Sequence, residues 1–192
     1  MNGGSYFANA GVFLIDTIFG VYILAIMLRF FLQVVRADFY NPLCQAIVTV
    51  TNPPLKPLRR IVPAVGKIDT SSLVLMLVLQ VISSYLIFFL LGVGPNFSGV
   101  LVSASAELIN KAIYLFIFAI IIQIVVSWIS PGTYNPIIGV IDTLTAPIMR
   151  PARNAVPPIG GIDLSPMLAL IVLTLSAMLI VAPLRDLGRS LL

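Results

Sequence analysis

The chain has no histidine, one cysteine and one glutamate, and only 9% of its residues are charged. Without histidine it cannot hold a serine–histidine nucleophile, histidine-based acid–base catalysis, or a histidine-ligated metal or haem. Cys44 has no second thiol with which to form an intrachain disulfide. The phosphate-binding motifs of P-loop and dinucleotide-binding proteins are also missing. We therefore expect a protein that is not an enzyme and needs no cofactor.

Apolar residues are what the chain has in excess, at 59% of the total and a mean hydropathy of +1.09. A helix needs roughly 20 apolar residues to cross the hydrocarbon core of a bilayer. Four runs reach or approach this length, near Val12–Val35, Leu73–Gly92, Ile109–Ile129 and Met167–Ala182. No basic segment precedes the first run, so we interpret it as a retained span rather than a signal peptide. The sequence predicts an all-α membrane protein with four transmembrane helices.

The chain contains a duplication. Asn41–Ser72 and Asn135–Pro166 align without a gap at an offset of 94 residues and are identical at 14 of 32 positions, where random sequences would agree at about two. The offset pairs the first apolar run with the third and the second with the fourth. We expect two helical-hairpin repeats, residues 1–94 and 95–192, with two spans each. Because a two-span unit returns to its starting side, the repeats should be parallel.

The connector inside each repeat predicts a short amphipathic helix. Asn41 and Asn135 are good N-caps, and a proline follows each at the first helical position. The expected apolar faces are Leu43, Ile47 and Val50 in the first copy and Ile137, Ile141 and Leu144 in the second, with Gln45, Thr49 and Asn52 on the opposite face of the first. About eleven residues are too few to span, so we expect this helix to lie in the interface or to re-enter.

The prolines that follow are expected to stop the connector helix and to favour extended backbone. Asp69 or Ser71 in the first copy, and Asp163 or Ser165 in the second, can then cap the next span. Arg59 and Asp69 are ten residues apart, as are Arg153 and Asp163, with a possible turn at Pro63–Gly66 or Pro157–Gly160 between them. We predict an ion pair in each connector that closes it over its hairpin. The alternative is that the arginine marks topology and the aspartate caps a helix, with no contact between them.

Basic residues gather in the connectors. The first holds Arg36, Lys56, Arg59, Arg60 and Lys67, the second holds Arg150 and Arg153, and the opposite side has Lys111, Arg185 and Arg189. This bias predicts cytoplasmic connectors and outside termini. Lys56, Arg60 and Arg150 are candidate contacts for anionic lipid headgroups. The basic residues do not cluster on a soluble domain, so we expect no nucleic-acid partner.

Polar residues interrupt the spans at related positions. The offset maps Arg29 to Gln123, Gln33 to Ser127, and Gln80 to Thr174. Such residues more often join helices by hydrogen bonds than line a pore, although a charge inside a membrane is a functional hypothesis by default. The arginine also lies close enough to the end of its span to snorkel to the headgroups. Structural contacts, a polar pathway and snorkelling all stay open at this point.

The stretch "TNPPLKPLRRIVPAVGKIDTSSLVLMLVLQ" and its second copy "TAPIMRPARNAVPPIGGIDLSPMLALIVL" resemble the bacterial YggT family, also called YlmG-like. The resemblance covers essentially the whole chain as two family repeats. It implies a small protein of the bacterial cytoplasmic (inner) membrane without demonstrated catalysis, associated with osmotic stress, cell division or, in plastid relatives, assembly of a membrane cytochrome complex. The haem link of the plastid relatives does not transfer to a chain without histidine.

Two kinds of function fit these features of the sequence. The favoured hypothesis is a scaffold or assembly factor that presents its duplicated connectors to other membrane proteins, in a bilayer with anionic headgroups and with homo-oligomerisation left open. The alternative is a small channel or transport element for ions or osmolytes. In that case the six polar span residues, Arg29, Gln33, Gln80, Gln123, Ser127 and Thr174, would line its route.

Overall fold

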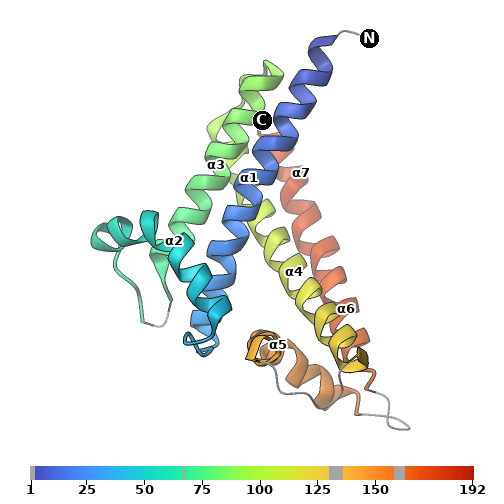
Figure 1. Ribbon diagram of the computed structural model, residues 1–192. Helices are drawn as coiled ribbons and strands as arrows, with labels where there is room; N and C mark the ends of the chain where they lie inside the picture. Colours follow the sequence, from blue (N-terminus) through green and yellow to red (C-terminus); the bar gives the residue numbers. More distant parts are fainter. Residues whose placement is uncertain (1–2, 67, 130–135, 158–162) are drawn as a thin grey trace.

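The computed structural model describes residues 3–66, 68–129, 136–157 and 163–192, and these form helices joined by short turns, without a β-strand. The elements are α1 (Gly3–Val34), α2 (Pro42–Ile61), α3 (Thr70–Leu91), α4 (Phe97–Ile129), α5 (Pro136–Ala155), α6 (Ser165–Ser176), the π-helical turn η1 (Ala177–Val181) and α7 (Ala182–Ser190). In chain order, α2 and α5 occupy equivalent places between long helices (Figure 1). The all-helical fold class and the internal repeat are therefore confirmed.

Four helices are long and apolar enough to cross a membrane: Tyr6–Val34, Thr70–Leu91, Phe97–Ile129 and Ser165–Ser190. At most 17% of the most apolar window of each is buried inside the protein. Apolar surface of this extent would be unstable in water and is what a lipid-facing helix needs. The protein is thus a multi-pass membrane protein with four candidate spans, two per repeat.

The spans are longer than the apolar runs suggested, most clearly at the end of the chain. We placed the end of the fourth span near Ala182, but the helix continues through α7 to Ser190. The π-helical turn ends at Val181, two residues before Pro183, which has no N–H to donate to the preceding turn of the helix. Beyond it, α7 packs closely on α4, because a Cβ on Gly188 would come within 3.0 Å of the backbone nitrogen of Ser103. Small residues permit such close approach between membrane helices.

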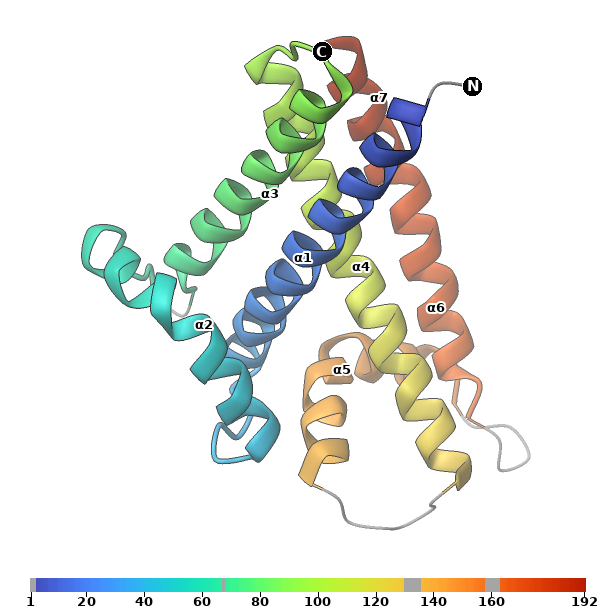
Figure 2. The ribbon, with the colours of Figure 1, turned by 45° about the horizontal axis from the view of Figure 1, so that its top comes forward.

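Both connector helices lie at the end of the bundle opposite the two termini (Figure 2). This placement confirms the parallel relation between the repeats. The hydrophobic contacts that join the repeats include Leu32 of α1, Ala119 of α4 and Val140 of α5. Phe31 and Phe116 add an edge-to-face ring contact at 4.9 Å. The two hairpins therefore share a core near the connectors.

The expectation that proline stops the connector helices is wrong. α2 continues to Ile61 through Pro53, Pro54 and Pro57, and α5 continues to Ala155 through Pro147 and Pro151. A proline removes the bond to the carbonyl four residues earlier and bends the helix, and α2 is visibly bent (Figure 1). The Tyr22 hydroxyl donates to the Val50 carbonyl, at 3.2 Å, which is the carbonyl that Pro54 leaves without its helical partner. The Tyr22 hydroxyl thus replaces one of the helical hydrogen bonds that the prolines remove.

The buried faces of these helices match the expected ones only in part. The residues of α2 that are buried are Cys44, Thr51 and Leu55, and those of α5 are Val140, Leu144, Thr145, Met149 and Ala152. Val50 and Ile137, which we placed on the apolar faces, are 55% and 46% exposed. Threonine occupies a buried position near the middle of the helix in both copies. The amphipathic character holds, and Leu43, Ile47, Ile141 and Leu144 of the expected apolar faces do pack in the core near the connectors.

Candidate functional site

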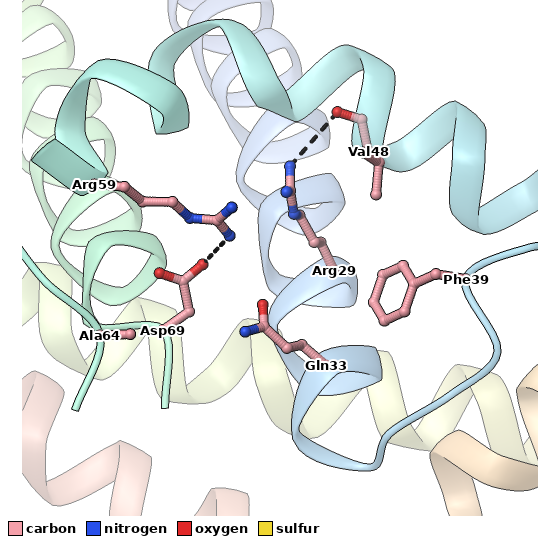
Figure 3. A pocket seen from close by; sticks show the side chains of 7 residues that line it. All are labelled: Arg29, Gln33, Phe39, Val48, Arg59, Ala64 and Asp69. Atoms are coloured by element: carbon pink, nitrogen blue, oxygen red, sulfur yellow. Dashed lines mark hydrogen bonds and ion pairs between the residues drawn. The ribbon is translucent and has the colours of Figure 1, made fainter. Parts of the chain in front are cut away.

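A cavity of about 470 Å³ lies where α2 crosses α1 in the first repeat. Its lining comes from α1, α2 and the segments that flank α2, and consists of Arg29, Gln33, Phe39, Val48, Arg59, Ala64 and Asp69 (Figure 3). Four of the seven were singled out from the sequence. The cavity combines charged and amide groups with apolar side chains, as small-ligand sites do.

Arg29 is held by α2 and does not snorkel. Its Nη1 donates to Thr51 Oγ1 at 2.7 Å and to Asn52 Oδ1 at 2.9 Å, and approaches the Val48 carbonyl at 3.5 Å. The residue is only 6% exposed. The side chain therefore reaches across to the connector helix rather than along its own helix to the headgroups. Of the three interpretations of Arg29, namely a structural contact, a polar pathway and snorkelling, the structure matches a structural contact between helices.

The second repeat builds the corresponding contact without a charge on the span. Gln123 donates from Nε2 to Asp142 Oδ1 at 2.7 Å and accepts from Thr145 Oγ1 at 3.2 Å. Gln123 is equivalent to Arg29, and Thr145 to Thr51, through the offset of 94. The same pair of positions thus joins span to connector helix in both hairpins.

Thr51 and Thr145 are the site residues that our sequence reasoning missed. Both side chains are fully buried, and each also donates to a carbonyl four residues earlier in its own helix. The only signal was that the threonine is identical in the two copies. Identity alone did not single out the buried pair, because Thr49 and Thr143 are also identical, although Thr49 is exposed and Thr143 is only partly buried.

Arg59 and Asp69 form the ion pair that closes the first connector. Asp69 is 2% exposed, and its Oδ2 also accepts from the Ser72 hydroxyl at 2.8 Å. Burial alone would raise the pKa of the Asp69 carboxyl, but the hydrogen bonds from Arg59 and Ser72 outweigh it and hold the pKa below its ordinary value of 3.8. The turn between them includes Gly66, whose φ of +62° favours glycine. The Ser71 hydroxyl fastens the turn by donating to the Val62 carbonyl at 2.6 Å.

Arg153 and Asp163 make the equivalent contact in the second connector, at 3.2 Å. This pair is more open, with side-chain exposures of 50% and 37%. Burial would raise the pKa of the Asp163 carboxyl, but the hydroxyl and backbone N–H of Ser165, together with Arg153, lower it. Asp163 thus acts as both a cap and an ion-pair partner, whereas we had set these as alternatives. The expected turn at 157–160 falls largely outside the described residues.

The remaining polar span residues do not converge. Gln33 lines the cavity, and Gln80 is buried in α3. Ser127 and Thr174 are exposed, and their hydroxyls donate to carbonyls of their own helices. The structure therefore does not assemble the six residues into one polar route. Lys56, Arg60 and Arg150 are all exposed on the connector helices.

The ion pair between the third and fourth spans was not expected. Arg185 of α7 forms a two-pronged contact with Glu107 of α4, at 2.8 Å from Nε to Oε1 and 3.2 Å from Nη2 to Oε2. Both residues lie inside candidate spans. We had read Arg185 as a topology signal in the tail, because the fourth span was expected to end before it. The longer helix brings it to the sole glutamate.

The polar groups of the cavity are two guanidiniums, one amide and one carboxylate already engaged by arginine. Within the described ranges, no cluster of histidine, cysteine, aspartate or glutamate could hold a metal ion. Guanidinium and amide groups donate hydrogen bonds and attract anions.

Comparison with known proteins agrees with the duplication. The CCB3/YggT family model matches the chain twice, at residues 8–90 and 102–184. An uncharacterised protein of Pseudomonas aeruginosa is 41% identical over 175 residues, covering 90% of this chain and 89% of its own. The uncharacterised protein YggT of Escherichia coli is 35% identical over 185 residues, or 96% of each chain. No solved structure matches. The chain belongs to the CCB3/YggT family.

Proposed function

We propose that the protein is a non-enzymatic scaffold or assembly factor of the bacterial inner membrane, which presents its two connector helices to other membrane proteins. The observation that supports this role is the placement of α2 and α5 at one end of the bundle, each tied to its span by the same pair of positions. Basic, amphipathic helices held at the same end of the bundle offer a docking face to proteins and to anionic headgroups. The family resemblance supports a link to envelope homeostasis in osmotic stress or cell division.

The proposed orientation has the connectors in the cytoplasm and the termini outside. Exposed basic residues on the connectors favour it, and the pairing of Arg185 with Glu107 reduces the opposing charge. Exposed aromatic side chains lie near both ends, with Tyr40 and Trp128 on the connector side and Tyr6 on the other, as at membrane interfaces. Reporters fused at Leu192 and near Pro54 test it. A cytoplasmic C-terminus would reject the orientation.

The docking role is tested by photo-crosslinking in intact cells. A crosslinking residue in place of Lys56 or Arg150 should capture the same partner from both connectors, because the two helices share one end. The matched control replaces Arg189, which is exposed at the opposite end. Capture that is equal at all three positions, or different at the two connectors, would contradict a shared docking face.

The channel alternative is less well supported, since Ser127 and Thr174 lie on the outer surface of their helices. Liposomes that contain only the purified protein should show no flux of ions or small osmolytes above empty liposomes. Clear flux that is abolished by Gln33→Leu together with Gln123→Leu would instead favour the channel over the scaffold.

A further inference from the structure

The cavity of the first repeat carries more positive than negative charge. Arg29 and Arg59 line it together with a single carboxylate, Asp69, and Arg59 already forms an ion pair with that carboxylate. Among the described residues, no carboxylate pairs with Arg29. The site is therefore left with one positive charge that the described protein does not neutralise directly.

Burial makes this charge costly. Arg29 is 94% removed from solvent, since its exposure is 6%, and its hydrogen-bond acceptors are a hydroxyl, an amide and a backbone carbonyl, all uncharged. A buried charge without a counter-ion is strongly destabilising. A guanidinium offers five N–H donors, and every contact that the described residues make with Arg29 uses Nη1. Donor capacity remains for a further acceptor.

Both guanidinium groups lie at the cavity, with Arg59 directed toward Asp69 and Arg29 toward the Val48 carbonyl (Figure 3). Arg59 repels Arg29, and the single carboxylate of Asp69 offsets only part of this repulsion. The Gln33 amide projects toward the same space from α1. Phe39, Val48 and Ala64 supply apolar walls around these polar groups. This combination suits an anionic group that is attached to, or flanked by, an apolar body.

The second repeat serves as an internal comparison. It keeps the connector ion pair but has Gln123 in place of Arg29, and the contact partner of Gln123 is Asp142. The neutral amide of Gln123 and the carboxylate of Asp142 leave no excess positive charge at the equivalent position. The feature that singles out the first repeat is thus the buried arginine rather than the connector fold.

We propose that the cavity between α1 and α2 binds an anionic phosphate-type group, held by Arg29 and Arg59, which supplies the counter-ion that the chain lacks. The phosphate can belong to a membrane lipid headgroup or to a free anion. The site is distinct from the exposed lysine and arginines on the outer face of the connector helices. The proposed anion binding does not depend on whether the connector helices dock other proteins.

The experiment uses the full purified chain in neutral detergent. Its thermal unfolding is measured against rising phosphatidylglycerol, phosphatidylcholine or inorganic phosphate, because a ligand that binds only the folded state raises the midpoint. Phosphatidylglycerol should raise it and phosphatidylcholine should not. An effect of inorganic phosphate as well identifies a free anion as a sufficient ligand, while an effect of phosphatidylglycerol alone identifies the lipid. Equal effects of the two lipids with none from phosphate would overturn the proposal.

Arg29→Gln, which installs the residue of the second repeat, should weaken the apparent affinity for the effective ligand at least about tenfold, as expected for loss of a hydrogen bond from a charged group. Arg60→Gln removes an exposed charge from α2, beside Arg59, and should change the affinity by less than about twofold. Equal losses in the two variants would show ordinary surface attraction and reject the site. If Arg29→Gln does not fold, Arg29→Lys replaces it. Lysine keeps the charge but loses the fork, so an unchanged affinity there also rejects the site.

Discussion

Arg29 and Thr51 are joined by a hydrogen bond of 2.7 Å that runs from the first span to the first connector helix, and the threonine is fully buried. The equivalent bond in the second repeat joins two uncharged side chains, Thr145 and Gln123, at 3.2 Å. Threonine to valine keeps the shape and removes the hydroxyl. We expect Thr51→Val to destabilise the protein by roughly 1–3 kcal/mol, because a buried charged donor loses an acceptor.

Thr145→Val is the matched control for that change. It removes a bond between neutral groups, so the expected loss is about 0.5–1.5 kcal/mol. Chemical or thermal unfolding of the two variants in the same detergent measures the difference. A loss at Thr145 equal to or greater than that at Thr51 would contradict a special role for the buried guanidinium.

The two connector ion pairs should differ in strength. Asp69 is nearly inaccessible, whereas the side chain of Asp163 is 37% exposed. We expect Asp69→Asn to lower the thermal midpoint clearly and Asp163→Asn to lower it little, since exposed pairs are worth only about 0–1 kcal/mol. Differential scanning fluorimetry on both variants decides this. The reverse order would show that the first pair is not a stabilising contact.

Stability should also depend on acid pH. The pKa of the Asp69 carboxyl is lower in the folded protein than its ordinary 3.8, so folding favours the ionised form. The stabilisation is fully present above the unfolded value and is lost as pH falls through the folded pKa. We expect the thermal midpoint to fall as pH drops below about 3.8, and the fall to be smaller in Asp69→Asn. If the thermal midpoints of the unmodified protein and of Asp69→Asn fall equally with pH, Asp69 is not the cause of the acid sensitivity.

The Glu107–Arg185 pair gives a further test. Both residues lie within the apolar length of α4 and the fourth span, so their contact is less screened than a pair in water. A double-mutant cycle with Glu107→Gln and Arg185→Gln should give a coupling above the roughly 1 kcal/mol limit of exposed pairs. Coupling near zero would mean that the two side chains are separately solvated.

Hydropathy and the repeat offset were sufficient to predict the helical class, the four spans and the parallel hairpins, because these follow from length and periodicity. Proline was the main source of error. Its effect on α2 depends on donors elsewhere in the fold, such as Tyr22, which local sequence does not reveal. The Arg59 and Asp69 contact was foreseeable because both ends recur at one spacing. Glu107 and Arg185 are 78 residues apart, and nothing in the chain pairs them until the helices are assembled.

The exchange of Arg29 for Gln123 has a consequence for how the molecule is seen from within the bilayer. Two parallel copies about an axis along the membrane normal would present the same face to neighbours on either side. The first copy places a guanidinium at the junction of span and connector, whereas the second places an amide and the Asp142 carboxylate there, so the two flanks of the molecule differ in charge. A protein or lipid that diffuses toward it laterally can then distinguish one flank from the other, so an assembly built on it need not be symmetric even though its fold nearly is.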